Sequence, residues 1–166
     1  TAYRNHGHVL LYGVDAKSAM AELTGRAAGC SAGKGGSMHM FGQAQGFYGG
    51  HGIVGAQVSL GTGLGFSHKY KEDGGVCIAY MGDGAADQGQ VAESYNMASL
   101  WKLPVLYIVE NNQYSMGTST KRHAAGDFYR RGEGFNVPGE RVDGMDIEAV
   151  MAATEQALGY VREGNG

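Results

Sequence analysis

Several features that mark other classes of protein are scarce in this chain. Only two of the 166 residues are cysteine, Cys30 and Cys77, and only two are proline. Two cysteines are too few for a disulfide framework or a metal cluster, so we expect reduced thiols. The net charge of −3 comes with no basic stripe and no acidic tail, which excludes a nucleic-acid partner and an acidic disordered tail. The longest apolar runs, such as residues 105–109, are too short to cross a membrane, and no signal segment opens the chain.

Glycine, in contrast, is abundant. Thirty of the 166 residues are glycine, whereas an average protein contains about 7%. The glycines alternate with aromatic and aliphatic residues, which argues against a low-complexity segment. They predict a fold in which the backbone closely approaches a ligand or another chain.

The length of the chain predicts a single domain over residues 1–166. A chain of this size can bury its own core. It starts at Thr1 without an initiator methionine and stops at Gly166, soon after a helical pattern. We therefore expect a segment of a longer subunit.

Four segments have the apolar spacing that predicts helices. They are residues 16–26, 55–69, 88–101 and 147–161. Asp15 and Asp146 precede the first and the last of these segments, where each is expected to act as an N-cap. In the first helix, the spacing predicts that Met20, Leu23 and Ala27 lie on one apolar face.

The helix at residues 55–69 consists mostly of small residues and carries little charge before Lys69. We expect it to be buried on nearly all sides, either in the core or between subunits. The last helix is expected to be amphipathic, and its apolar face should consist of Ile147, Val150, Met151, Thr154, Ala157, Leu158 and Val161. Residues 29–52 predict a long glycine-rich loop, and loops of this length are usually functional.

Two short apolar runs, residues 76–81 and 105–109, flank the third helix. A strand, a helix and a strand of these lengths predict a βαβ unit, in which the strands are parallel. Uninterrupted apolar strands are typical of a sheet that is covered on both faces. We expect another short strand around Val142. The predicted fold class is α/β, with a doubly wound and mainly parallel sheet.

Both predicted strands run into polar residues. Because the crossover is right-handed, Asp83 and Asn112 should lie at the same edge of the sheet, where open α/β sheets bind ligands. Asp83 offers a carboxylate, Asn112 an amide oxygen and Tyr114 a backbone carbonyl, a set that suits Mg²⁺ shared with phosphate oxygens. Gly82 and Gly84 let backbone N–H groups approach an anion, and the following helix N-terminus favours negative charge. Gly-Asp-Gly alone is a common turn, but its pairing with Asn112 predicts a metal-bridged diphosphate site.

The sequence Gly82-Asp83-Gly84, followed later by Asn111-Asn112, resembles the signature of thiamine-diphosphate enzymes. Within that group, the chain is similar to the alpha subunits of pyruvate dehydrogenases along nearly its whole length. The matching stretches are residues 3–7, 33–40, 52–58, 82–89, 100–104, 110–117 and 142–146. The resemblance implies a thiamine-diphosphate-binding fold, with thiamine diphosphate and Mg²⁺ as cofactors.

The resemblance also implies roles for residues at the two strand ends. Asp83, Asn112 and the carbonyl of Tyr114 would hold the Mg²⁺. Gly84 and Ala85 would line the diphosphate.

A second group of residues with implied roles lies earlier in the chain. Tyr3 and Arg4 would reach the phosphates, and a guanidinium fork suits phosphate oxygens. Gly52 and Val54 would meet the aminopyrimidine ring through their backbone groups. His51 is a candidate catalytic proton relay, because a histidine titrates near neutral pH; a plain hydrogen-bonding role is the alternative.

The implied activity is the oxidative decarboxylation of pyruvate with transfer of the acetyl group to a lipoyl group. The implied partners are a small 2-oxo acid, a beta subunit in an α₂β₂ tetramer and a lipoyl-bearing acyltransferase. In the family, the glutamate that activates the pyrimidine belongs to the beta subunit, so this chain alone would not complete a turnover. Its expected location is the bacterial cytoplasm or the mitochondrial matrix.

Three alternatives remain. The alpha subunit of an acetoin dehydrogenase shares the Gly-Asp-Gly sequence and the run at residues 35–40. A non-catalytic assembly module would keep the fold without a working site. A nicotinamide-binding domain is disfavoured, because the glycines at 61, 63 and 65 lie inside a predicted helix rather than between a strand and a helix.

Three further features near the predicted site carry expectations. Asp87 is expected to add negative charge close to the diphosphate. His39 is expected to be a structural or interface histidine. Residues 118–123 are polar and are expected to form a flexible loop at the mouth of the site.

Overall fold

The computed structural model describes all residues, Thr1–Gly166. They form two compact units, Thr1–Gln57 and Val58–Gly166, and the boundary falls inside helix α3 (Ala56–Lys71). None of the helices combines the length and the apolar character that a membrane span requires.

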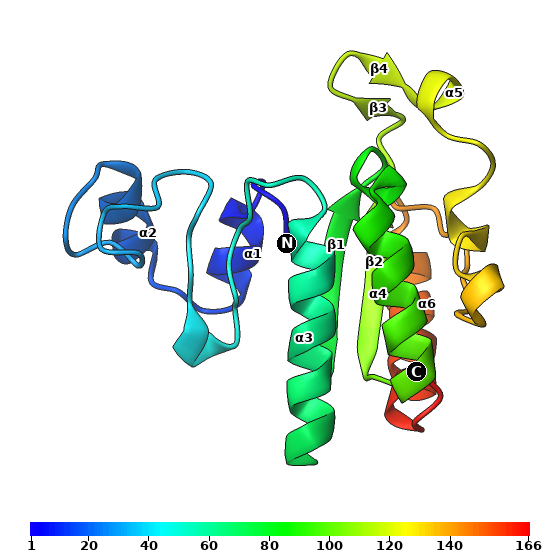
Figure 1. Cartoon of the computed structure of the whole chain (residues 1–166). Helices are drawn as coiled ribbons and strands as arrows, with labels where there is room; N and C mark the ends of the chain where they lie inside the picture. The colour runs from blue at the N-terminus through cyan, green and yellow to red at the C-terminus, as the bar shows by residue number, and fades with distance from the viewer. The chain divides into compact units, whose positions relative to one another are not determined.

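The first unit contains two short helices and a long irregular segment (Figure 1). Its elements are α1 (His6–Leu11), α2 (Ala16–Leu23) and the 3₁₀ turn η1 (Gln43–Gln45). Its core is formed by Val9, Val14, Ala19, Met40 and Phe47. The predicted glycine-rich loop at residues 29–52 is confirmed, since η1 is its only helical turn.

Helix α2 confirms the predicted start but not the predicted face. The carboxylate of Asp15 accepts a hydrogen bond from the N–H of Ser18 at 3.1 Å, as expected of an N-cap. The helix ends at Leu23, and Met20 and Leu23 are 61% and 42% exposed. The buried residues are instead Ala19 and Glu22. The predicted face differs from the observed one because the carboxylate of Glu22 turns inwards and accepts hydrogen bonds from four backbone N–H groups.

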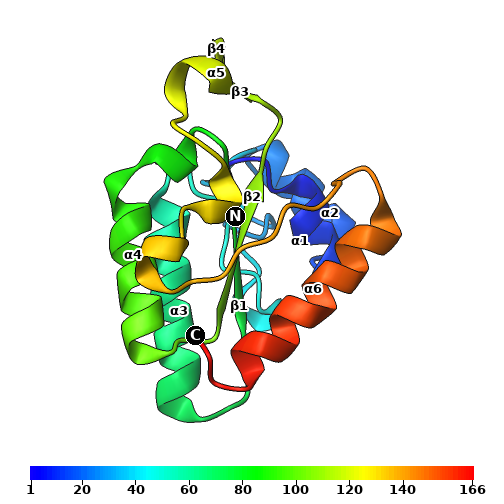
Figure 2. The same ribbon diagram turned by 90° about the vertical axis from the view of Figure 1, so that its right-hand side faces the viewer.

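The second unit is built on a parallel pair of strands, β1 (Cys77–Gly82) and β2 (Val105–Glu110). Helix α4 (Gly89–Trp101) connects them, and α3 and α4 cover one face while α6 (Ile147–Arg162) covers the other (Figures 1 and 2). The predicted βαβ unit and the α/β class are confirmed. The larger doubly wound sheet stays a prediction, because this sheet has two strands.

Two glycines of helix α3 allow it to pack closely on the sheet. A Cβ atom at Gly61 would lie 2.8 Å from the Cβ of Ala79 in β1, and one at Gly65 would collide with Val105 in β2. Only glycine lets the helix backbone approach the strands this closely. On this face α3 is a core helix of its own unit.

The remaining elements of the second unit follow the strands in sequence. They are η2 (Ala85–Asp87), β3 (Tyr114–Ser115), β4 (Thr118–Ser119), α5 (Thr120–His123), η3 (Phe128–Arg130) and η4 (Glu133–Phe135). β3 and β4 form an antiparallel hairpin. Met81, Val91 and Tyr95 are central members of the core.

Two expectations for the second unit were wrong, and a third is confirmed only in part. Val142 lies in no strand, because residues 141–143 follow an irregular path into the cap of α6. The amphipathic face of α6 is confirmed for Val161, which is buried, and for the half-buried Val150, Thr154, Ala157 and Leu158. Only Ile147 and Met151 of the predicted face are exposed, at 70% and 58%. Helix α3 is not buried on nearly all sides, because Leu60 and Phe66 on its outer face are 51% and 48% exposed. The predicted cap of α6 is confirmed, with Asp146 accepting from two backbone N–H groups.

Candidate cofactor site

The carboxylate and the amide of the predicted metal site, Asp83 and Asn112, lie at one edge of the sheet. Gly82 and Glu110 are the last paired residues of β1 and β2. Asp83 follows directly after this pair, and Asn112 follows two residues after it. Because neighbouring strands run about 4.8 Å apart, the strand register brings these two residues to the same carboxyl-terminal edge.

Asp83 is the residue whose surroundings point most directly to a cation. It is only 3% exposed, and its Oδ1 accepts a hydrogen bond from the N–H of Gly84 at 2.9 Å. Its Oδ2 is buried and has no hydrogen-bond partner. A buried carboxylate oxygen without a partner is costly and requires an explanation. A bound cation would supply one, so the donor set fits the expected Mg²⁺.

The second strand end is shaped by two consecutive side-chain turns. Asn111 Oδ1 accepts from the N–H of Gln113, and Asn112 Oδ1 accepts from the N–H of Tyr114, both at 2.9 Å. Gln113 adopts a left-handed conformation with φ of 70° between them. An amide oxygen carries two lone pairs, so Asn112 keeps one for a further ligand. Tyr114 then begins β3.

Gly84 lies against the hairpin that follows β2. A Cβ atom at Gly84 would come within 2.6 Å of the Cβ of Ser115 and still closer to its hydroxyl. Gly84 and Ser115 line a cavity of about 220 Å³ together with Asp87, Thr118 and His123. The predicted diphosphate residue Gly84 therefore borders a small polar cavity with two hydroxyl groups in its wall. Ala85, beside it, is buried at the start of η2.

The expected excess negative charge of Asp87 is compensated. Its Oδ1 lies 2.6 Å from Nη1 of Arg131, and its Oδ2 lies 2.5 Å from Nδ1 of His123. The same Nη1 donates to the carbonyl of Ala86 at 2.7 Å, and the guanidinium lies 4.5 Å from the ring centre of Phe128. Residues 118–123, which were expected to form a loop, form β4 and α5, and His123 of α5 contacts Asp87.

The remaining predicted site residues belong to the first unit. Ala2 and His51 form an isolated parallel bridge, in which the N–H of His51 donates to the carbonyl of Thr1 at 3.2 Å. Tyr3 and Arg4 follow one side of this bridge, and Gly52 and Val54 follow the other. The structure thus brings these two short segments together. Tyr3, Arg4 and Val54 are exposed.

His51 has surroundings that favour a neutral ring. Its Nε2 lies 3.1 Å from the carbonyl oxygen of Tyr48, and its ring meets Phe41 edge-on. Burial disfavours the charged form and lowers the pKa of His51 below its ordinary value. A neutral, hydrogen-bonded ring suits the predicted hydrogen-bonding role of His51. Its catalytic role as a proton relay stays a prediction.

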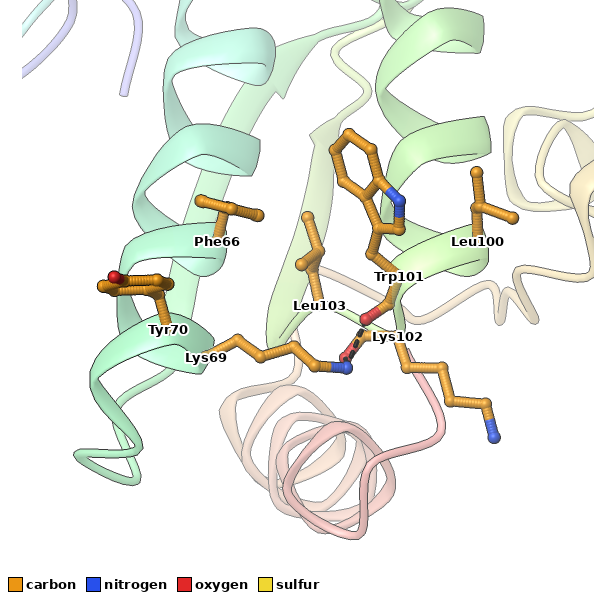
Figure 3. Close-up of a pocket in the computed structure, with 7 residues that line it drawn as sticks. All are labelled: Phe66, Lys69, Tyr70, Leu100, Trp101, Lys102 and Leu103. Carbon is orange, nitrogen blue, oxygen red and sulfur yellow. Dashed lines mark hydrogen bonds between the residues drawn. The ribbon is translucent and has the colours of Figure 1, made fainter.

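A larger hollow, of about 420 Å³, lies at the other end of the second unit (Figure 3). Its walls are Phe66, Lys69, Tyr70, Leu100, Trp101, Lys102 and Leu103. Lys69 Nζ donates to the carbonyl oxygens of Trp101 and Lys102. This hollow lies where α3 and α4 end and β2 is about to begin, away from the carboxyl ends of the strands, and none of the predicted site residues lines it.

The predicted site residues are therefore divided between the two units. Tyr3, Arg4, His51, Gly52 and Val54 belong to the first, and Asp83, Gly84, Ala85, Asn112 and Tyr114 to the second. Sequence reasoning missed two residues that shape these segments, Glu22 and Arg131. Glu22 is the only acid of its helix, and Arg131 meets Asp87 although the two are far apart in the sequence. Neither position carries a local pattern; the only signal was the unusual glycine content of the loop facing Glu22.

Comparison with known proteins gives one consistent family. The family model described as the dehydrogenase E1 component matches residues 1–166. All of this chain aligns with 48% of the Rhizobium meliloti pyruvate dehydrogenase E1 component subunit alpha at 62% identity. It aligns with 47% of the corresponding Zymomonas mobilis subunit at 59% identity, and with 42% of the somatic mitochondrial form from Bos taurus at 56% identity. The chain thus spans about half the length of these relatives. Because the family match covers every residue, the chain belongs to the dehydrogenase E1 component family.

Proposed function

We propose that this chain is the thiamine-diphosphate-binding core of the alpha subunit of a pyruvate dehydrogenase. The observation that carries the proposal is the buried, unpartnered Oδ2 of Asp83 at the carboxyl-terminal edge of the sheet, beside Asn112. The names of the relatives support pyruvate as the substrate. The same proposal includes a doubly wound sheet and a single cofactor-binding domain within a longer subunit.

The residues of the second unit are assigned to the metal and the diphosphate. Asp83, Asn112 and the carbonyl of Tyr114 would hold Mg²⁺, which prefers a few protein oxygens together with phosphate oxygens. Gly84 and Ala85 would line the diphosphate. The ion pair of Asp87 with Arg131 removes the repulsion that a free carboxylate would exert there.

The residues of the first unit are assigned to the rest of the cofactor. Tyr3 and Arg4 would bind phosphate oxygens, and the backbone groups of Gly52 and Val54 would bind the aminopyrimidine. When bound, thiamine diphosphate supplies the electron sink that decarboxylation of a 2-oxo acid requires. His51, whose ring is neutral at pH 7 because its pKa is lowered, would act as a hydrogen-bonding neighbour of Gly52.

The proposed reaction is the oxidative decarboxylation of pyruvate, with the acetyl group passed to a lipoyl group. A beta subunit would complete the site, and a lipoyl-bearing acyltransferase would accept the product. The proposed location follows from these partners: the cytoplasm in a bacterium, or the mitochondrial matrix in a eukaryote.

The test is an activity assay of the full alpha subunit assembled with its beta subunit, with pyruvate and acetoin offered separately. We expect turnover of pyruvate that requires both Mg²⁺ and thiamine diphosphate, and none after Asp83→Asn. Turnover of acetoin without turnover of pyruvate would replace the proposed substrate. An assembled complex that binds neither cofactor would favour the non-catalytic assembly module.

A further inference from the structure

Glu22 is a fully buried carboxylate that forms no salt bridge in the structure. It lies on α2 with 0% exposure, and its two oxygens accept four backbone hydrogen bonds. Oε2 accepts from Ser31 at 2.7 Å and Gly33 at 2.8 Å, and Oε1 accepts from Gly35 at 2.6 Å and Gly36 at 3.0 Å. The loop therefore wraps its N–H groups around one anionic side chain.

Glycine is required where this loop passes closest to α2. A Cβ atom at Gly29 would lie 2.6 Å from the Cα of Glu22. Gly33 has a φ of 73°, and a Cβ atom there would lie 2.7 Å from the carbonyl oxygen of Arg26. Burial alone would raise the pKa of the Glu22 carboxyl, but the four N–H groups outweigh it and hold that pKa below its ordinary value. The side chain is thus a buried carboxylate ion at neutral pH.

The wrapped loop is tied to the segment that carries Gly52. Ser31 Oγ donates to the carbonyl of His39 at 2.8 Å, and the N–H of His39 donates to the carbonyl of Gly35 at 3.2 Å. His39 then reaches the next segment, with Nδ1 3.1 Å from the carbonyl oxygen of Gly50. The N–H of Gly50 in turn donates to the carbonyl oxygen of Met40 at 3.2 Å.

His39 also limits where Gly52 can lie. A Cβ atom at Gly52 would be 3.0 Å from Cε1 of the His39 ring, so the ring packs directly against this glycine. On the other side of the loop, Asn5 Nδ2 donates to the carbonyl of Met38 at 3.0 Å. A displacement of His39 would therefore move residues 50–52.

We propose that Glu22 is a positioning residue for residues 50–54, acting through the loop that it folds and through the imidazole of His39. The role rests on the proposed function, in which Gly52 and Val54 bind the aminopyrimidine of thiamine diphosphate. Glu22 touches no reacting atom. It fixes the backbone that would bind the ring.

The first test measures amide hydrogen exchange by mass spectrometry on the cofactor-free full subunit in its native assembly. In Glu22→Gln, one acceptor oxygen is replaced by an NH₂ group that faces N–H donors, so these hydrogen bonds weaken. We expect exchange to become about tenfold faster in residues 31–36 and also in residues 50–54. Glu155→Gln, an exposed glutamate of α6, is the matched control and should leave both segments unchanged.

The second test separates the contact between His39 and Gly50 from the hydrogen bonds between Glu22 and the loop. His39→Leu removes the contact with Gly50 while leaving the four hydrogen bonds of Glu22 in place. We expect faster exchange in residues 50–54 with residues 31–36 unchanged. In the assembled enzyme, both Glu22→Gln and His39→Leu should raise the thiamine diphosphate concentration for half-maximal activity about tenfold, while kcat at saturating cofactor changes less than twofold.

The outcomes distinguish this proposal from the proposed function. If Glu22→Gln loosens only residues 31–36, or if His39→Leu leaves residues 50–54 protected, Glu22 has a local structural role and the proposal is overturned. If Glu22→Gln does not fold, hydrogen exchange in His39→Leu still shows whether residues 50–54 depend on the contact with His39. If the native assembly binds no thiamine diphosphate, the proposed function fails, but the exchange experiment still tests whether Glu22 orders residues 50–54.

Discussion

Replacing Arg131 by methionine should destabilise the second unit and loosen the turn beside Gly84. Arg131 makes three interactions at once: with the carbonyl of Ala86 at 2.7 Å, with Asp87 at 2.6 Å and with the ring of Phe128 at 4.5 Å. Methionine keeps much of the aliphatic stem but makes none of the polar contacts. The variant therefore isolates the contribution of the guanidinium.

The expected size of the effect follows from these contacts. A hydrogen bond from a charged donor contributes about 1.5–3 kcal/mol. An ion pair that is partly exposed adds at most about 1 kcal/mol, and the side chains of Arg131 and Asp87 are 22% and 30% exposed. The contact with Phe128 adds about 0.5–1 kcal/mol. We expect the free energy of unfolding to fall by about 2–5 kcal/mol.

The neighbouring Arg130 provides the control. It pairs with Glu133 at 2.9 Å, but both side chains are more than half exposed, so Arg130→Met should have little effect. Urea-induced unfolding of the full chain, followed by circular dichroism, measures both variants. Equal losses of stability in the two would refute the reasoning. A double-mutant cycle with Asp87→Asn then separates the ion pair from the other contacts.

Three further predictions concern individual residues. Gly84→Ala should weaken Mg²⁺-dependent binding of thiamine diphosphate at least tenfold, as measured by calorimetry, because the new Cβ atom would collide with Ser115. The added change Ser115→Gly should recover part of this loss. Burial raises the pKa of the Cys77 thiol to about 11, so at pH 8 its alkylation by iodoacetamide should be about 100-fold slower in the folded chain than in urea, and equal rates would contradict this. The pKa of Glu22 is lowered in the folded chain, so its ionisation stabilises the fold fully above the ordinary carboxyl pKa of about 4.3 and less as the pH falls through the native pKa. Glu22→Gln should remove this part of the dependence of the free energy of unfolding on pH. An unchanged pH profile in the variant would argue against this role of Glu22.

The parts of the fold that sequence predicted are those with a local cause. The two apolar runs form parallel strands, as expected of uninterrupted apolar segments joined by a helical crossover. Their register then determines that Asp83 and Asn112 reach the same edge. The caps at Asp15 and Asp146 were also predictable, since a carboxylate before an apolar periodic segment satisfies its first N–H groups.

The parts that sequence did not predict depend on contacts between distant segments. Apolar periodicity takes no account of a buried acid, so it grouped Met20 with Leu23 on the apolar face, whereas Met20 is exposed and Glu22 is buried. No local pattern links Arg131 to Asp87, because the two meet only after the chain has passed through β2 and the hairpin. Val142 has the character of a strand residue, yet no neighbouring strand pairs with it.

The most direct test of the central claim is a calorimetric titration of thiamine diphosphate into the full subunit, with and without Mg²⁺, beside Asp83→Asn. Asparagine keeps the shape of the side chain but removes the charge from the unpartnered oxygen. We predict binding by the native protein only when Mg²⁺ is present, and at least a hundredfold loss of affinity in the variant, in line with the loss of a charged ligand. Equal binding by both proteins, or binding that needs no metal, would contradict the assignment of the strand-end site.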